Sequence, residues 1–221
     1  MKFFIDTANL DQIKEANDLG ILDGVTTNPS LMAKEGIKGE ANIRQHYIDI
    51  CNIVKGDVSA EVISTDFEGM IHEGRELAML HPQIVVKVPC IKEGIKAIKY
   101  FTDNGIRTNC TLVFSVGQAL LAAKAGATYV SPFVGRLDDI STDGVELIRK
   151  IVQVYDHYGY RTQVLAASIR HTMHIIQCLE AGADVATCPL DAILGLLRHP
   201  LTDSGLKKFL EDYGTTCRSL S

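Results

Sequence analysis

Residues 84–88 read IVVKV, four β-branched apolar residues interrupted by a single lysine, Lys87. A continuous apolar run, rather than a strict alternation of apolar and polar residues, is typical of a strand that is covered on both faces. Similar runs recur along the chain, separated by longer segments of helical periodicity. The strands predicted in this way are 2–6, 24–28, 58–63, 84–88, 107–113, 129–134, 162–168 and 185–189.

The segments between these strands carry the apolar stripe of amphipathic helices; in residues 42–54, for example, Ile43, Tyr47 and Ile50 recur at helical spacing. Eight strands, each followed by a helix, predict an α/β protein with a single (β/α)8 barrel (a TIM barrel) over residues 1–221. The alternative is an open doubly wound sheet, but no GxGxxG or GxxxxGK[ST] fingerprint is present. An additional C-terminal helix at about 203–215 is expected to pack on the barrel or on a neighbouring subunit.

The net charge of the chain argues against nucleic acid and anionic membranes as partners. The chain has 221 residues and a net charge of -5, which gives no electrostatic reason to expect nucleic acid or an anionic membrane as partner. No stretch resembles a signal peptide or approaches the length of a membrane span, so we expect a cytoplasmic protein. Six scattered cysteines without a CxxC pair favour free, mostly buried thiols over disulfides.

Polar residues stand near the C-terminal ends of almost all the apolar strands. In a (β/α)8 barrel these ends face the active site. Side chains two residues apart on a strand share a face, so Asn109 lies with Thr111 and Ser131 with Phe133. The residues expected at the barrel mouth are Asp6, Asn28, Glu61, Lys87, Asn109, Thr111, Ser131 and Ser168.

Lys87 is the most informative of these residues. An ammonium group in an apolar strand is costly to bury unless it is paired or loses its proton. Both outcomes suit a nucleophilic amine that forms an imine with a carbonyl substrate. The alternative is a lysine at a strand end that simply reaches solvent. Asp6 and Glu61 are an acid/base pair for aldol chemistry, or they merely neutralise Lys87.

Arg136 and Arg170 each follow a strand end, where an arginine fork suits phosphate oxygens; the alternative is two solvated surface arginines. His171 and His174, three residues apart on a predicted helix, could share a face. A metal site would need a third ligand, and no other His or Cys has suitable spacing. We therefore expect ordinary hydrogen-bonded or surface histidines and no metal.

Seven motifs in one order resemble the transaldolase family, specifically its short-chain branch, which also includes fructose-6-phosphate aldolases. The resemblance runs from residue 1 to about the last helix, so it covers nearly the whole chain. The motifs are FIDTAN (4–9), GVTTNPS (24–30), VSAEV (58–62), VVKVP (85–89), TNCTLVFS (108–115), YVSPFVGRLDD (129–139) and AASIR (166–170).

The resemblance implies a role for each residue. Lys87 would form the Schiff base, and Asp6 would act as acid/base on the hydroxyl next to the bond that breaks. Glu61 and Thr111 would hold the catalytic water. The groups implied to bind the dihydroxyacetone unit are Asn28, Asn109, Ser131 and Ser168, and those implied to bind the phosphate are Arg136 and Arg170.

Two positions separate the branches of this family. Aldolase-type members have Gln at the position of Glu61 and Tyr at that of Phe133, whereas this chain has Glu and Phe, like the transaldolases. A Tyr hydroxyl could help to protonate and release the three-carbon product, and Phe has no proton to donate. Transfer is therefore the implied reaction, with a fructose-6-phosphate aldolase as the nearest alternative. A metal-dependent aldolase and a non-catalytic sugar-phosphate binder are the others.

The implied reaction moves a dihydroxyacetone unit between sugar phosphates in the non-oxidative pentose phosphate pathway. Sedoheptulose 7-phosphate and glyceraldehyde 3-phosphate would give erythrose 4-phosphate and fructose 6-phosphate. No metal or organic cofactor is expected, because the lysine imine supplies the electron sink. Short-chain relatives tend to form large rings, so the resemblance also implies a homo-oligomer such as a decamer.

Overall fold

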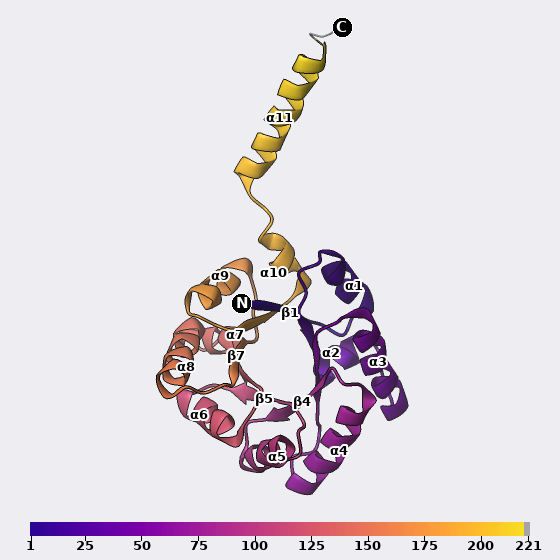
Figure 1. Ribbon diagram of the computed structural model, residues 1–221, viewed down its shortest axis with the longest axis vertical. Helices are drawn as coiled ribbons and strands as arrows, with labels where there is room; N and C mark the ends of the chain where they lie inside the picture. Colours follow the sequence, from indigo (N-terminus) through magenta and orange to yellow (C-terminus); the bar gives the residue numbers. More distant parts are fainter. Residues whose placement is uncertain (219–221) are drawn as a thin grey trace.

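The computed structural model describes residues 1–218, and side chains as far as residue 215. Eight parallel strands form a closed barrel in the order β1 to β8, with β8 paired to β1, and helices surround it (Figure 1). The predicted (β/α)8 barrel is confirmed. The strands are β1 Lys2–Asp6, β2 Gly24–Thr26, β3 Asp57–Glu61, β4 Ile84–Pro89, β5 Thr108–Val113, β6 Tyr129–Pro132, β7 Gln163–Ala166 and β8 Val185–Cys188.

The helices that follow the strands form the outer layer. Two of the three shortest, α2 and α7, come directly after β2 and β6 at the barrel mouth and were not predicted. The helices are α1 Leu10–Asp18, α2 Pro29–Lys34, α3 Glu40–Ile53, α4 Phe67–Leu80, α5 Lys92–Asp103, α6 Val116–Ala125, α7 Val134–Asp138, α8 Gly144–Tyr158, α9 Thr172–Glu180, α10 Leu190–Gly195 and α11 Pro200–Arg218.

Several strands end earlier than predicted. The runs 129–134 and 162–168 end as strands at Pro132 and Ala166, and the run 24–28 ends at Thr26. In each case the apolar or polar residues beyond the strand form the turn into the next helix, as where Val134 begins α7. Hydropathy does not distinguish a buried turn of this kind from the strand before it, so these boundaries were wrong.

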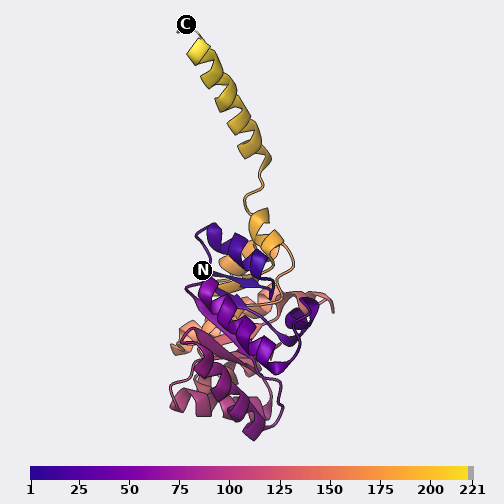
Figure 2. The same ribbon diagram turned by 90° about the vertical axis from the view of Figure 1, so that its right-hand side faces the viewer.

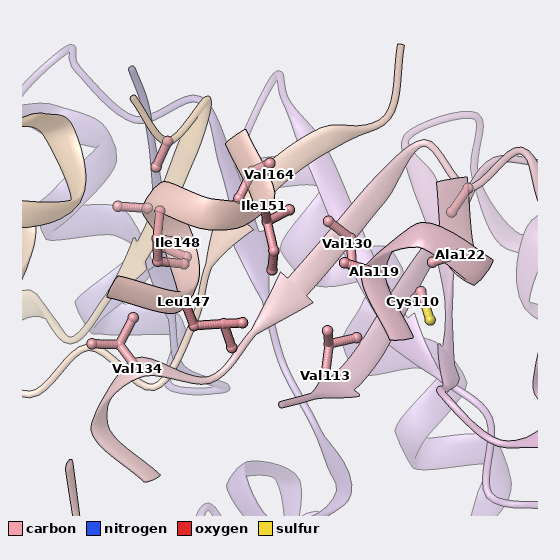
Figure 3. Packing of buried hydrophobic residues seen from close by; sticks show 14 of the residues in the cluster. Cys110, Val113, Ala119, Ala122, Val130, Val134, Leu147, Ile148, Ile151 and Val164 are labelled. Atoms are coloured by element: carbon pink, nitrogen blue, oxygen red, sulfur yellow. The ribbon is translucent and has the colours of Figure 1, made fainter. Parts of the chain in front are cut away.

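The main core lies between the barrel and its helices. Alanines of α6 and aliphatic side chains of α8 pack against the outward-facing residues of β5, β6 and β7 (Figure 3). Cys110, Val130 and Val164 are among these strand residues, and each is at most 1% exposed. Of the cysteines with described side chains, Cys51, Cys110, Cys178 and Cys188 are buried free thiols and Cys90 is a partly exposed one; the side chain of Cys217 lies outside the described part.

The smallest of three apolar clusters in the described part of the chain fills the inside of the barrel. It joins side chains from five different strands: Phe4, Val85, Tyr129, Leu165 and Val185. The rings of Phe4 and Tyr129 meet edge to face, with centroids 5.8 Å apart. These side chains, called the plug below, fill the half of the barrel nearer the N-terminal ends of the strands, and a cavity opens in the other half, at the C-terminal ends.

The last helix, α11, extends away from the barrel into open space (Figure 2). It begins at Pro200 rather than near residue 203 and runs beyond the predicted end. Its large apolar side chains are between 58% and 73% exposed; they are Leu201, Leu206, Phe209, Leu210 and Tyr213. No helix in the described part of the chain is both long and apolar enough to cross a membrane.

Candidate active site

Side chains alternate between the inner and outer faces of each strand, and this places the site next to the plug, on its C-terminal side. Since side chains two residues apart share a face, the residues after Phe4, Val85 and Tyr129 on the inner face are Asp6, Lys87 and Ser131. The strand register brings neighbours level with Lys87, which pairs with Glu61 on one side and Asn109 on the other. The same alternation that buries the plug therefore exposes a polar layer at the mouth.

A cavity of about 130 Å³ opens at this mouth. Seven of the predicted site residues line it, namely Asp6, Asn28, Lys87, Ser131, Phe133, Arg136 and Ser168. Three further residues complete the lining: Thr26, Ala167 and Thr187. Glu61, Asn109, Thr111 and Arg170 lie outside this lining, so the structure brings together most but not all of the predicted set.

Lys87 lies at the bottom of the cavity, and its side chain is 7% exposed. Its Nζ is 3.0 Å from Oε2 of Glu61 and donates a hydrogen bond of 3.1 Å to the carbonyl oxygen of Thr27. The lysine therefore does not reach bulk solvent, which removes the simple strand-end interpretation. A buried amine beside a carboxylate has a proton acceptor at hand when it attacks a carbonyl.

Asp6 shares the cavity with Lys87. Burial raises the pKa of its carboxyl group, while the charge of Lys87 and a 2.8 Å hydrogen bond from the Thr26 hydroxyl oppose the rise. A carboxyl group with a raised pKa holds a proton closer to neutral pH than an ordinary aspartate does. That is the property required of a group that takes up and returns a proton in each cycle.

Glu61 faces two spaces. It contacts Lys87 on one side, and on the other it borders a larger cavity of about 560 Å³ between α3 and α4. Tyr47 of α3 supports the end of β3, because its hydroxyl accepts a 3.3 Å hydrogen bond from the Glu61 amide. Burial, chiefly, raises the pKa of Tyr47 to about 12, so this phenol keeps its proton.

Asn109 and Ser131 form a buried polar chain with Ser59 of β3. The Ser131 hydroxyl donates to Oδ1 of Asn109 at 2.7 Å, and Nδ2 of Asn109 donates to Oγ of Ser59 at 3.1 Å. Asn109 thus acts on the cavity through Ser131, whose position it fixes. The Thr111 hydroxyl is buried and has no hydrogen-bond partner among the described residues.

Phe133, Arg136 and Ser168 line the cavity from the segments that follow β6 and β7. The Arg136 guanidinium carbon lies 5.2 Å from the centroid of the Phe133 ring, a cation–π contact. Phe133 also meets the ring of Phe114 edge to face at 5.5 Å. Ser168 has φ of 58°, a strained left-handed conformation that turns the chain at the cavity rim.

The second predicted phosphate ligand, Arg170, is engaged elsewhere. Its Nη2 forms a 2.5 Å ion pair with Asp139, and its side chain is 50% exposed. His174 is buried and lies against Asp138, and the exposed His171 caps the N-terminus of α9. This is the arrangement of hydrogen-bonded or surface histidines that the sequence predicted.

Two threonines were missed from the sequence. Oγ1 of Thr26 and Oγ1 of Thr187 are 2.6 Å apart, within hydrogen-bond distance. The Thr26 hydroxyl also donates a hydrogen bond to Asp6. Threonine is a common strand residue, so its type gave no signal. Its place did: Thr187 is two residues beyond the plug residue Val185 on β8, the only strand to which no polar site residue had been assigned.

Comparison with known proteins identifies the family of the chain. The family model described as transaldolase/fructose-6-phosphate aldolase matches residues 3–220. The chain belongs to this family. A probable transaldolase of Parabacteroides distasonis is 81% identical over 213 residues, covering 96% of this chain and 98% of the relative. Relatives with the same description from Porphyromonas gingivalis and Cytophaga hutchinsonii are 78% and 73% identical, each over 96% of this chain and 97% and 98% of theirs.

Among solved structures, thiamine phosphate pyrophosphorylase from Pyrococcus furiosus superimposes with a TM-score of 0.61. The match covers 88% of this chain and 87% of that one, at 18% sequence identity. A likeness at this identity concerns the fold alone and says nothing of the reaction.

Proposed function

We propose that this family member is a transaldolase that moves a dihydroxyacetone unit from a ketose phosphate to an aldose phosphate through a Schiff base on Lys87. The observation that carries the proposal is the buried Lys87 amine, 3.0 Å from the Glu61 carboxylate and in the same cavity as Asp6. The expected donors are sedoheptulose 7-phosphate and fructose 6-phosphate. The expected acceptors are glyceraldehyde 3-phosphate and erythrose 4-phosphate.

The chemistry follows from the positions of the groups. The Lys87 amine adds to the substrate ketone, and loss of water gives an imine. Asp6 then takes the proton of the hydroxyl next to the scissile bond; that bond breaks, and its electron pair moves to the imine nitrogen to form an enamine. Glu61, beside the amine, moves protons to and from the oxygen that leaves as water, and Thr111 is proposed to share this water. An acceptor aldehyde reverses the sequence.

Substrate binding is proposed to divide between two walls. Ser131, held by Asn109, with Asn28 and Ser168, offers hydroxyl and amide groups to the dihydroxyacetone unit. Arg136 lies at the cavity edge, where a planar fork binds phosphate oxygens in pairs. Arg170 is proposed to join it by leaving Asp139, since an exposed ion pair is worth little and exchanges easily for a phosphate.

Phe133 supports transfer rather than release. It lines the cavity and brings no hydroxyl to it, so the enamine has one proton donor fewer at that wall. The test is a measurement of free dihydroxyacetone from fructose 6-phosphate with and without glyceraldehyde 3-phosphate. Turnover should need the acceptor; rapid release of dihydroxyacetone without it would identify an aldolase instead. Unchanged turnover in a chelator is expected as well, because no step is assigned to a metal.

The exposed apolar face of α11 supports assembly. Five large apolar side chains on a helix that extends into solvent make an unfavourable surface for a monomer. We propose a cytoplasmic homo-oligomer of single-domain subunits, with a decamer as the expected form, in which α11 packs on a neighbouring copy. Leu206→Lys with Phe209→Lys should lower the mass measured by light scattering; an unchanged mass would contradict this.

A further inference from the structure

His174 is a buried histidine that none of the proposed catalytic steps uses. It lies in the first turn of α9, and its side chain is 8% exposed. Its Nδ1 accepts a hydrogen bond of 3.2 Å from the backbone N–H of Arg170. Its Nε2 lies 2.9 Å from Oδ2 of Asp138. With Nδ1 acting as an acceptor, the ring is the neutral tautomer that carries its proton on Nε2 and donates it to Asp138.

The two partners of His174 belong to two different walls of the cavity. Asp138 ends α7, the short helix that carries Arg136 two residues earlier. Arg170 follows β7 in the loop that carries Ser168, again two residues earlier. Arg136 and Ser168 both line the cavity. His174 therefore bridges α7, which carries Arg136, and the loop that carries both Ser168, proposed to bind the three-carbon unit, and Arg170, proposed to join Arg136 on the phosphate.

The same two segments are also joined at their other ends. The Val134 amide donates to the Ala167 carbonyl at 2.9 Å, and the Gly135 amide donates to the Ser168 carbonyl at 3.0 Å. The approach is close, because a Cβ on Gly135 would lie 2.4 Å from the Ser168 carbonyl oxygen. Backbone bonds thus fix the start of α7 against the loop, and the imidazole fixes its end.

Asp138 extends the bridge one step further. Its Oδ1 accepts a 3.0 Å hydrogen bond from the Gly144 amide at the start of α8, while its Oδ2 faces His174. Both carboxylate oxygens are therefore engaged, and α7 is attached to α8 as well as to the loop. A helix of five residues has few contacts of its own, so such bonds decide where its side chains lie.

We propose that His174 is a positioning residue that holds α7 and the 167–171 loop in register, and so sets the distance between the groups that bind the two ends of a ketose phosphate. This inference rests on the proposed function, in which Arg136 binds the phosphate. It assigns His174 an effect on phosphorylated substrates that a purely structural histidine would not have. His174 itself does not touch the substrate.

The surroundings keep the ring neutral. Burial and the neighbouring His171, whose ring centroid is 3.7 Å away, lower the pKa of His174, and Arg170 acts in the same direction. Asp138 opposes them. The buried Cys178 thiol lies one turn along the same helix. A protonated ring would direct an N–H at the Arg170 amide, so the bridge should weaken in acid.

The experiment compares two ketose donors that differ only in the phosphate. In His174→Leu, with glyceraldehyde as acceptor, KM for fructose 6-phosphate should rise about tenfold while kcat changes by less than about threefold, as expected for the loss of two hydrogen bonds that position a binding group. KM for fructose should stay within about twofold. An equal change in both KM values, or none in either, would overturn the proposal.

Two further variants keep the test independent of folding. Asp138→Ala removes the bridge from a side chain that is 38% exposed, and it should raise KM for fructose 6-phosphate selectively as well. His174→Gln can still donate to Asp138 and should recover part of the loss. His157→Leu, on the exposed face of α8, is the matched control and should behave like the parent.

The proposed function and this inference fail in different ways. Borohydride reduction with dihydroxyacetone should label Lys87 equally in the parent and in His174→Leu. No label in the parent would contradict the Schiff base itself. A full label in both proteins, with no selective change in KM, would contradict only the role of His174.

Discussion

An aspartate lies at each end of the barrel, and the two aspartates differ in how many partners bind their carboxyl groups. At the N-terminal end, Asp57 is fixed by an ion pair of 2.5 Å with Arg107 and a hydrogen bond of 2.8 Å from the Tyr129 hydroxyl. At the C-terminal end, Asp6 has one hydroxyl partner, Thr26, and shares the cavity with Lys87. The bonds of Asp57 fix its position and stabilise the fold, whereas the Asp6 carboxyl, whose pKa burial raises, is suited to exchange a proton.

Replacement of Lys87, at the C-terminal end of the barrel, should cause the largest loss of turnover of all the variants considered. Lys87→Met has no amine to form the imine, so turnover should fall by about 10⁴-fold or more. Lys99→Met, at an exposed site on α5, is the control and should retain full turnover. Activity is measured by coupled assay and folding by circular dichroism; substantial turnover in a folded Lys87→Met protein would exclude the covalent route.

Asp6→Asn should lower kcat by about 10²- to 10⁴-fold, because the amide cannot accept the hydroxyl proton. It should also stabilise the protein in a pH-dependent way. The pKa of Asp6 is raised on folding above its ordinary 3.8, so the stability that the protonated carboxyl contributes is lost as pH rises through the folded-state pKa. Asn escapes this loss, which is about 1.4 kcal/mol per pKa unit.

The check is urea unfolding of parent and Asp6→Asn across a pH series. The difference in free energy of unfolding should grow above pH 3.8 and level off once Asp6 is ionised in the folded protein. A difference that does not depend on pH would show that Asp6 does not titrate as described.

Phe133→Tyr, at the barrel mouth, should change the fate of the enamine, with a smaller effect than the replacement of Lys87 or Asp6. A hydroxyl at this wall supplies a proton donor near the enamine, so the ratio of dihydroxyacetone release to transfer should rise by about tenfold. Phe114→Tyr, the edge-to-face neighbour, provides the comparison. If the two variants partition alike, Phe133 does not separate transfer from release.

Asp57→Ala should have the smallest effect on turnover, within about twofold, because the N-terminal end takes no part in catalysis. It should lower the free energy of unfolding by about 1–2 kcal/mol, chiefly through the lost Tyr129 hydrogen bond, since the ion pair with a 40%-exposed Arg107 adds little. A large loss of kcat in folded Asp57→Ala would contradict the claim that only the C-terminal end takes part in catalysis.

The sequence alone predicted much of the difference between a catalytic C-terminal end and a structural N-terminal end of the barrel. Apolar runs with one polar residue near the C-terminal end predicted both the barrel and the location of Lys87, because burial on both faces leaves a strand few polar positions. The plug was not predicted, since Phe4 and Tyr129 look like any other strand residues until closure brings them together. The family resemblance, rather than spacing, assigned a reaction.

Long-range pairings account for what was missed. The α2 and α7 helices are too short for a periodic signal, so the bridge from Asp138 through His174 could not be seen. Likewise, Thr26 and Thr187 become neighbours only when β8 closes on β1 beside β2. The ion pair between Arg170 and Asp139 depends on side-chain conformation, which a pattern does not encode.

The most direct test of the central claim is borohydride reduction in the presence of fructose 6-phosphate, followed by peptide mapping. An imine on the buried amine should give irreversible inactivation that requires substrate, with one three-carbon adduct on Lys87. Inactivation without substrate, an adduct on another lysine, or full activity after treatment would contradict Schiff-base catalysis at the barrel mouth.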